Sequence, residues 1–295
     1  MRIRRALASE HAIGWTFVGP AVLLVVVFGL VPIGWSFLLS FQRSNLIAPP
    51  RFTGLDNYRY LLKDPTFREA TRHTLLYTAL FVPISVVGSL FIAVALNRKI
   101  RFIRFYRLAV FVPVVASTIA TSFMFLWLFD STYGLANFVL GKVGIGPFGF
   151  FDSTHDALYS IVAMTVWGWI GFDVIIYLAA LQGIPRELVE AAEIDGASRW
   201  SVFRNITVPW LGPATLLLIV WSSINALQLF DEVYFVTHGG PLHSTYVLVF
   251  YLFTLAFTQG VAGYATAIAY VLFVAILILT IIQFWIGNKV VHYSS

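Results

Sequence analysis

One long apolar segment, residues 158–182, carries aromatic and polar side chains at regular spacing. Trp169, Asp173 and Tyr177 lie four residues apart, so a helix would place them on one face. Trp167 lies two residues before this series. An aspartate near the middle of such a segment is costly unless it is functional or paired. The spacing therefore indicates a ligand path along this helix face.

A second apolar segment, residues 211–231, repeats the pattern. Its aromatic and polar residues form one helical stripe, with a serine beside it: Trp221, Ser222, Asn225, Gln228 and Glu232. Aromatic faces with amide and hydroxyl groups suit a sugar or polyol, which offers apolar ring faces and many hydroxyls. Tryptophan and tyrosine near segment ends are also typical interfacial anchors, so that interpretation stays open for Tyr177 and Trp221.

A polar island, Glu187–Pro213, lies between these two segments. Its first part, 186–195, predicts a short helix with a small, smooth alanine face and exposed glutamates. Gly196 then breaks the helix, and glycine is needed if the chain turns there through positive φ. Ser198 is placed to cap a second helix. The simplest interpretation is an amphipathic loop on lipid headgroups, but its residue pattern favours another one.

Composition identifies the solvent of this chain as lipid. Of 295 residues, 59% are hydrophobic and 11% are charged, whereas soluble proteins carry about 25% charged residues. There is no cysteine, and the six histidines show no metal-ligand spacing. No Gly-x-x-x-x-Gly-Lys-Ser/Thr motif occurs, which argues against ATP hydrolysis by this chain.

Six segments are long and apolar enough to cross a bilayer, since a spanning helix needs about 20 residues. They are 13–41, 74–96, 105–129, 158–182, 211–231 and 264–287. The sequence therefore predicts an all-α polytopic membrane protein. Its single transmembrane domain, 13–287, lies between short ends at 1–12 and 288–295.

Basic residues predict the orientation. The block at 98–107 lies in a short loop against span ends, which places that loop in the cytoplasm. With six spans, both termini and the loop 183–210 are cytoplasmic too. Segment 246–257 is too short to span, so we interpret it as re-entrant or interfacial. If it spans, the C-terminus lies outside.

The polar loop resembles the EAA loop of bacterial ABC-importer permeases. The matching pattern is Glu190-Ala191-Ala192, three residues, Gly196, nine residues, Ile206, one residue, then Val208-Pro209. Val208 stands where that family has leucine. Four further segments are similar to carbohydrate-type permeases: 52–67, 107–141, 181–198 and 237–245. The specific likeness is to the maltose-type larger permease and the glycerol-3-phosphate-type first permease.

This resemblance implies the type I ABC-importer permease fold, with six transmembrane helices, in the bacterial inner (plasma) membrane. The implied partners are a second homologous permease, two ATPase subunits that bind ATP and Mg, and an extracytoplasmic substrate-binding protein. The chain itself would hold no cofactor and catalyse no reaction. The coupling helix, which sits in a groove of an ATPase subunit, would use Glu190, Ala191, Ala192, Asp195 and Gly196.

The resemblance also implies that substrate contacts come from the fourth and fifth spans. Trp169-Ile170-Gly171 matches the Trp-x-Gly motif of the family, and Asp173 stands where proline is usual. The expected substrate path is Trp167, Trp169, Gly171, Asp173, Ser222, Asn225 and Gln228.

Several of these residues have more than one interpretation. Asp173 either pairs with a cation of the partner permease or attracts a cationic group on the cargo, as in glycerophosphocholine or an amino sugar. Asn225 and Gln228 equally suit bonds to the partner permease. Asp231 and Glu232 lie near the outer end of their span, either solvated or part of an outer gate.

Two other functional classes predict sequence features of their own. A six-span secondary transporter or channel predicts inverted repeats and ion-linked polar chains, and a membrane enzyme predicts a nucleophile, metal cluster or cofactor motif. The sequence shows none of these. We therefore expect the permease of an ATP-driven, binding-protein-dependent importer whose cargo is a sugar, polyol or glycerophosphodiester.

Overall fold

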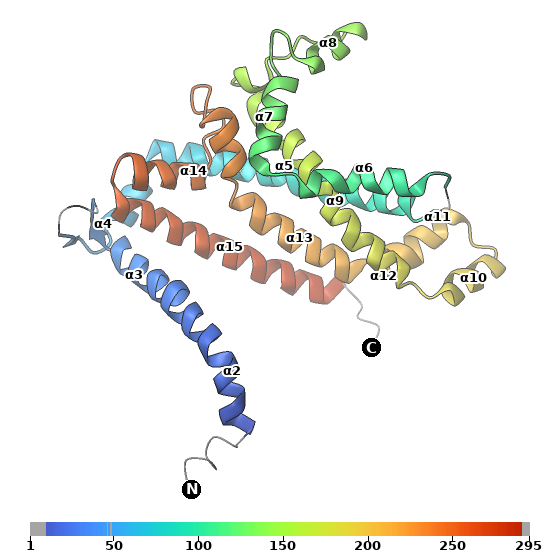
Figure 1. Ribbon diagram of the computed structural model, residues 1–295, viewed down its shortest axis with the longest axis horizontal. Helices are drawn as coiled ribbons and strands as arrows, with labels where there is room; N and C mark the ends of the chain where they lie inside the picture. The colour runs from blue at the N-terminus through green and yellow to red at the C-terminus, as the bar shows by residue number, and fades with distance from the viewer. Residues whose placement is uncertain (1–9, 46, 48, 99, 291–295) are drawn as a thin grey trace. The chain divides into compact units, whose positions relative to one another are not determined.

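The computed structural model describes residues 10–290 apart from 46, 48 and 99, and this part of the chain is mainly helical (Figure 1). It divides into two units. Unit 1 comprises Met1–Lys63 and Leu252–Val271, and unit 2 comprises Asp64–Tyr251 and Leu272–Ser295. The predicted cytoplasmic ends fall largely at 1–9 and 291–295, outside the described residues.

Unit 1 begins with a long helical run. It consists of α2 (Glu10–Val25), the π-helical turn η1 (Val26–Leu30) and α3 (Val31–Ser40). The stretch Gly14–Ser40 is apolar and long enough to cross a membrane, and none of its most apolar window is buried inside the protein. A helix thus lies where the first span was predicted, with its apolar surface left for lipid or a partner.

Short elements follow the C-terminal end of α3 within unit 1. Strands β1 (Gln42–Arg43) and β2 (Arg51–Phe52) pair antiparallel, and α4 (Asp56–Leu61) follows. The Asn57 amide donates to the backbone oxygens of Ser40 at 2.8 Å and Gln42 at 3.0 Å. The first bond satisfies a carbonyl that the end of α3 leaves without a helical partner, and the second ties β1 to α4.

Three long helices form the core of unit 2: α5 (Pro65–Leu96), α9 (Ala157–Gln182) and α13 (Gly212–Leu227). Helix α5 begins at Pro65, which occupies its first turn. The Asp64 carboxylate caps it by accepting from the Thr66 N–H at 2.9 Å. The buried cluster that joins the three helices is Val86, Ala93, Leu96, Val174, Tyr177, Leu178, Leu181, Leu211 and Leu218.

The predicted third span, 105–129, is one apolar segment but two helices. α6 (Ile103–Val115) and α7 (Thr118–Leu128) meet at 107°. The bend occurs because Ala116 and Ser117 take extended backbone conformations, with ψ of 141° and 135°. This bend brings the start of α7 to the side of α9, where it contributes to the site described below.

The connection from α7 to α9 contains regular elements. It contains α8 (Leu135–Lys142) and a 3₁₀ turn, η2 (Phe150–Asp152). The Asp130 carboxylate starts the connection by accepting the Thr132 and Tyr133 N–H groups at 2.8 and 2.9 Å. The bond from the Tyr133 backbone holds the pKa of Asp130 below its usual range.

Four short elements link α9 to α13. They are α10 (Arg186–Ile194), α11 (Arg199–Val202), η3 (Phe203–Thr207) and α12 (Val208–Trp210). The run Arg199–Trp210 meets α13 at 62°. This bend separates the polar loop from the span that follows it, near Leu211, where the sequence places the start of the fifth span.

The last part of the chain consists of η4 (Val233–Thr237), α14 (Leu248–Phe253), η5 (Thr254–Thr258) and α15 (Ala262–Val290). The apolar helix Leu248–Thr258 falls among those shorter than a span, in line with the interpretation of 246–257. Within the described residues, four helices are long enough to cross a membrane, or up to six if each bent pair counts as one span.

Candidate functional site

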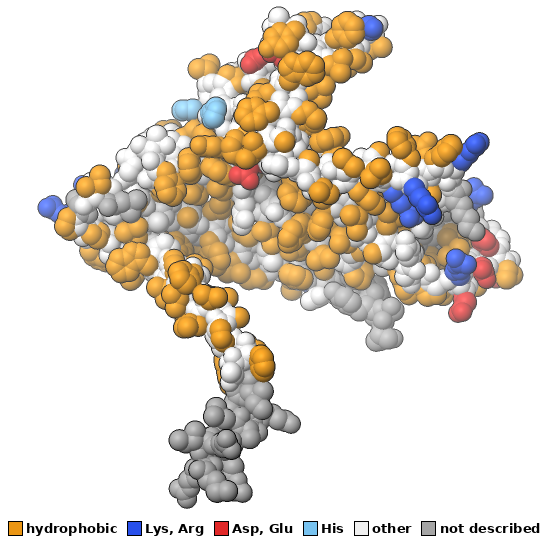
Figure 2. Space-filling view, in the orientation of Figure 1, with side chains coloured by type: hydrophobic (Ala, Val, Ile, Leu, Met, Phe, Trp, Pro, Cys, Tyr) orange, Lys and Arg blue, Asp and Glu red, His pale blue; other side chains and the backbone are white. Residues whose placement is uncertain are grey.

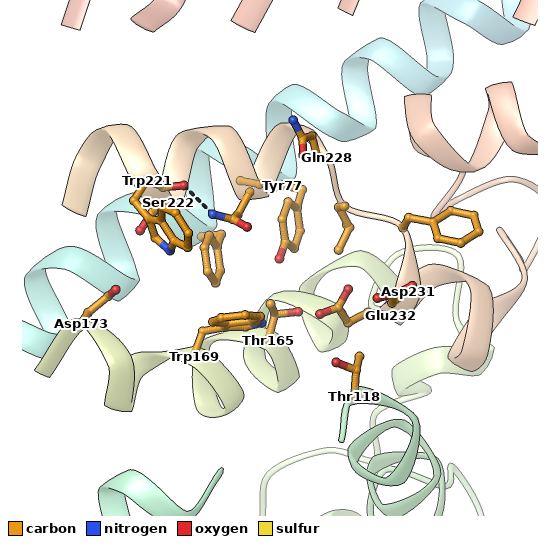
Figure 3. A pocket seen from close by; sticks show the side chains of 15 residues that line it. Tyr77, Thr118, Thr165, Trp169, Asp173, Trp221, Ser222, Gln228, Asp231 and Glu232 are labelled. Carbon is orange, nitrogen blue, oxygen red and sulfur yellow. Dashed lines mark hydrogen bonds between the residues drawn. The ribbon is translucent and has the colours of Figure 1, made fainter. Parts of the chain in front are cut away.

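A cavity of about 190 Å³ lies within unit 2 among α5, α9 and α13 (Figure 3). Its wall mixes aromatic, amide, hydroxyl and carboxylate groups. The lining residues are Tyr77, Phe81, Thr118, Thr165, Trp169, Asp173, Trp221, Ser222, Asn225, Ala226, Gln228, Leu229, Phe230, Asp231 and Glu232. Five of the seven predicted path residues are among them, so the structure brings the two predicted helix faces together.

Helix α9 supplies Thr165, Trp169 and Asp173 at intervals of one turn. The Trp169 side chain is 41% exposed, whereas Asp173 is 3% exposed. The Asp173 Oδ2 atom accepts a hydrogen bond from the Ser85 hydroxyl of α5 at 2.6 Å. Within the described part of the chain, Asp173 thus has a hydroxyl donor, and no ion pair is found for it.

Helix α13 supplies the opposite wall. Trp221 is 45% exposed, and its ring lies 5.7 Å from that of Phe172. The Asn225 amide nitrogen donates to the Trp221 carbonyl at 2.8 Å, the bond drawn in Figure 3. Asn225 and Gln228 are both exposed, and Ser222 is buried in the cavity wall. These polar groups and the indole rings can present both donors and flat apolar faces to a ligand.

Two predicted path residues do not line this cavity. The Trp167 ring packs edge-on against Phe125, with centroids 5.3 Å apart. Gly171 lies where α6 approaches α9: a Cβ there would lie 2.7 Å from Val114 Cγ2 and overlap the Val110 carbonyl oxygen. In this chain the glycine of the Trp-x-Gly motif therefore serves helix packing.

The alternative interpretation of Tyr177 also has a structural outcome. Tyr177 is fully buried in the core cluster, and its hydroxyl donates to Thr215 Oγ1 at 3.1 Å. It is therefore neither an interfacial anchor nor a cavity residue. Trp221, by contrast, lines the cavity despite its position near a span end.

Sequence reasoning missed several lining residues. Tyr77 and Phe81 of α5 lie four residues apart with stacked rings, 5.5 Å between centroids. That spacing inside an apolar segment was the available signal. Thr118 reaches the cavity because of the bend before α7, for which Pro113 is a local signal of a break but not of its angle. Asp231 and Glu232, which had been assigned to the outer end of a span, line one end of the cavity.

The polar loop forms an exposed corner at Gly196, between α10 and α11. Gly196 has φ +80°, its N–H donates to the Glu193 carbonyl at 3.1 Å, and the Ala197 N–H donates to the Ala192 carbonyl at 2.9 Å. These two bonds are a Schellman motif, which ends α10. Ser198 caps α11 by accepting from the Ser201 N–H at 3.2 Å. Both local predictions are confirmed.

The predicted coupling residues lie on the surface of this corner. Glu190, Ala191, Asp195 and Gly196 are exposed, and Ala192 is half-buried. Ile194, at 86% exposure, adds an apolar side chain to the same surface. Helix α10 has no buried residue, so this unit leaves it accessible to another protein.

Known proteins resemble this chain along nearly its whole length. Residues 72–292 match the family described as binding-protein-dependent transport system inner membrane component. The lactose transport system permease protein LacF of Rhizobium radiobacter is 37% identical over 282 residues, covering 94% of each chain. The arabinooligosaccharides transport system permease protein AraP of Bacillus subtilis is 35% identical over 278 residues, covering 93% of this chain and 88% of AraP.

A solved structure has the same fold. It is a bacterial ABC transporter involved in the import of the acidic polysaccharide alginate, with a TM-score of 0.83 and 20% identity, covering 99% of this chain and 100% of the matched chain. The predicted fold class is thereby confirmed, and the relatives confirm a transport subunit rather than an enzyme. This chain belongs to the family of binding-protein-dependent transport system inner-membrane components, as a carbohydrate-type permease of an ABC importer.

Proposed function

We propose that this chain forms half of the translocation path of an ATP-driven importer for a carbohydrate. A second, homologous permease supplies the other half, two ATPase subunits bind ATP and Mg, and an extracytoplasmic binding protein delivers the cargo. One observation carries the proposal: in a chain of this family, five path residues from two helices line a single cavity. They are Trp169, Asp173, Ser222, Asn225 and Gln228.

The proposed cargo is a sugar or oligosaccharide. Its support is chemical, because two indole faces and several amide and hydroxyl groups line the cavity. It is also comparative, because relatives are named for lactose, arabinooligosaccharides and trehalose/maltose. A polyol fits the same groups. Buried Asp173 favours a second cargo class, one with a cationic group such as an amino sugar or glycerophosphocholine.

We further propose that α10 and the corner at Gly196 couple this chain to an ATPase subunit. Glu190 is exposed and able to pair with a basic side chain, and the small Ala191 and Ala192 side chains permit close approach. Helix α10 directly follows α9, and α11 and α12 connect the corner to α13, so movement of α10 would reach both helices that line the cavity. The free energy of ATP hydrolysis would thus reach this chain through the contact between α10 and the ATPase subunit.

The proposed orientation places the polar loop and both termini in the cytoplasm of a bacterium. Lys and Arg side chains gather over the end of unit 2 that holds α10, α11 and the start of α6 (Figure 2). Arg98, Arg101 and Arg104 precede or open α6, and Arg199 and Arg204 follow α10. Clustered basic residues next to apolar helices are typical of the cytoplasmic side.

The deciding experiment is transport by the reconstituted complex. The tagged chain is expected to co-purify with an ATPase and a second permease. In proteoliposomes with the binding protein, ATP should drive uptake of a labelled cargo from a panel of lactose, arabinooligosaccharides, trehalose, maltose and glycerophosphocholine. Uptake that an ion gradient drives without ATP would instead identify a secondary transporter and overturn the proposal.

A single variant then separates the two cargo classes. Asp173→Asn keeps the size of the side chain and removes its charge. If Asp173 binds a cationic group, this variant should lower uptake of cationic cargo by about tenfold while retaining neutral cargo. Equal uptake of cationic and neutral cargo by the variant would rule out a cationic cargo group bound by Asp173, and a neutral carbohydrate would remain as the proposed cargo.

A further inference from the structure

The charge of the cavity wall has one sign. Asp173, Asp231 and Glu232 line it, and none of the other lining residues is lysine, arginine or histidine. Figure 3 shows Asp173 at one end of the cavity and the other two carboxylates at the opposite end. A ligand lying between the two indole rings would therefore have carboxylates at both of its ends.

Among the described residues, no lysine, arginine or histidine is found paired with these carboxylates. The ion pairs of Arg59 with Asp56 and of His155 with Asp156 involve other residues. The hydrogen bond to Asp173 comes from the neutral Ser85 hydroxyl. The acidic groups thus face the cavity without a cationic partner from the described part of the chain.

Such a wall discriminates between ligands by charge. Apolar helices surround the cavity, and walls of low polarity concentrate the field of charges that line a cleft. Screening by salt is weaker for partly buried charges than for exposed ones. An anionic ligand would lose its hydration shell and meet like charges, whereas a neutral or cationic ligand would not.

We propose that this chain's side of the path is a charge filter: carbohydrates without net negative charge pass, and acidic carbohydrates are rejected. The inference rests on the proposed function and narrows its cargo. Asp231 and Glu232 are the specificity-determining residues that the test addresses, because substituting them leaves the buried hydrogen bond between Ser85 and Asp173 in place. Asp231 is exposed and Glu232 half-buried.

The absence of cysteine makes a direct probe possible. Asn225→Cys would place a unique thiol of this chain in the cavity wall. Its rate of modification is measured in the assembled importer with two methanethiosulfonate reagents, one carrying trimethylammonium and one carrying sulfonate. The ratio of the two rates reports the local potential and cancels the thiol's own reactivity. Leu242→Cys, at an 89% exposed position outside the lining, gives the reference ratio.

The cationic reagent is expected to be favoured at Asn225→Cys by about tenfold more than at Leu242→Cys. Adding Asp231→Asn and Glu232→Gln should remove most of that preference. Adding Asp152→Asn, an exposed carboxylate outside the lining, should leave it intact. A preference equal to the reference, or a thiol that neither reagent reaches, would overturn the filter.

Transport gives the second readout. In proteoliposomes, the intact importer should take up a neutral oligosaccharide and reject the same oligosaccharide with one C6 hydroxymethyl group oxidised to a carboxylate. The binding protein is the same in every sample, so a rise in the acidic-to-neutral ratio in the Asp231→Asn/Glu232→Gln variant locates selection in this chain. Equal uptake of both sugars by the intact importer would contradict the charge filter but not the proposed function. Absence of any ATP-driven uptake would contradict the proposed function, and the ratio of thiol modification rates would still test the charge filter.

Discussion

Two neighbouring tryptophans show that position along a helix determines whether a side chain lines the cavity. Trp167 and Trp169 have equal exposure, 41% each, but only Trp169 lines the cavity. Two residues along a helix turn the side chain by about 200°, so the two indoles leave the helix on opposite sides. Sequence reasoning assigned both to the path because residue type and depth in the segment do not distinguish them.

This contrast gives a matched pair of variants. Trp169→Ala should lower ATP-driven uptake of a neutral carbohydrate by about tenfold, because it removes one apolar face of the cavity, worth about 1.4 kcal/mol. Trp167→Ala removes an equal side chain from the contact with Phe125 and should change uptake much less. Uptake is normalised to the amount of assembled complex. Equal losses in both variants would contradict the assignment of the cavity.

Glycines of α9 provide a second pair. Gly171→Ala would push a methyl group into the Val110 carbonyl and Val114, so α6 and α9 must move apart. We expect a loss of about 1–3 kcal/mol in stability, the usual cost of overpacking, seen as a lower midpoint of thermal unfolding of the complex. Gly168→Ala meets nothing within 4 Å and should be neutral or slightly stabilising, because alanine favours a helix. An equal fall in both variants would refute the close approach.

At the scale of elements, the turn at Gly196 was predictable from local residues, whereas the angle of the bent span was not. Gly196 and Ser198 act through bonds to residues within five positions, so their types predict the turn and the cap. For the 107° bend at Ala116–Ser117, Pro113 is a local signal that the helix is bent or broken, but it predicts neither the size of the bend nor its direction. Packing between helices determines the angle of this bend, and the bend in turn determines the position of Thr118. Tyr77 enters the cavity for the same reason: tertiary contacts choose which face of α5 meets α9.

The corner itself yields the element-scale prediction. Proline cannot adopt the positive φ of Gly196, and it lacks the N–H that donates to Glu193. Gly196→Pro should therefore displace α10 and abolish ATP-driven uptake, while cargo binding outside the membrane persists. Glu190→Lys should do the same by reversing the charge offered to the ATPase. Both effects are read from uptake and from cargo-stimulated ATP hydrolysis.

A tolerant substitution serves as the control for that corner. Asparagine enters the left-handed region at modest cost, so Gly196→Asn should keep the Schellman bonds and most of the uptake. Loss of uptake in Gly196→Asn would mean that the position needs more than its backbone conformation. Normal uptake in both Gly196→Pro and Glu190→Lys would remove the coupling role of α10.

At the scale of the whole molecule, membrane topology depends on one short helix. The apolar run Leu248–Thr258 has eleven residues by its bounds, or about 16 Å at 1.5 Å per residue, against a hydrocarbon core of about 30 Å. By itself this run is too short to cross the bilayer. If each bent pair is one crossing, the four long helices and the two pairs make six crossings, and we expect this even number to return the C-terminus to the side of the N-terminus.

The lack of native cysteine lets single thiols test this count in intact cells. A membrane-impermeant maleimide added outside should label Thr154→Cys, which lies in the connection between α7 and α9, because that connection is extracytoplasmic if the basic block at 98–107 is cytoplasmic. Arg101→Cys and a cysteine added after Ser295 should react only after the membrane is opened. If the C-terminal thiol reacts from outside while Arg101→Cys stays protected, the chain crosses an odd number of times. Leu248–Thr258 would then be part of a crossing, and the C-terminus would lie opposite the coupling loop.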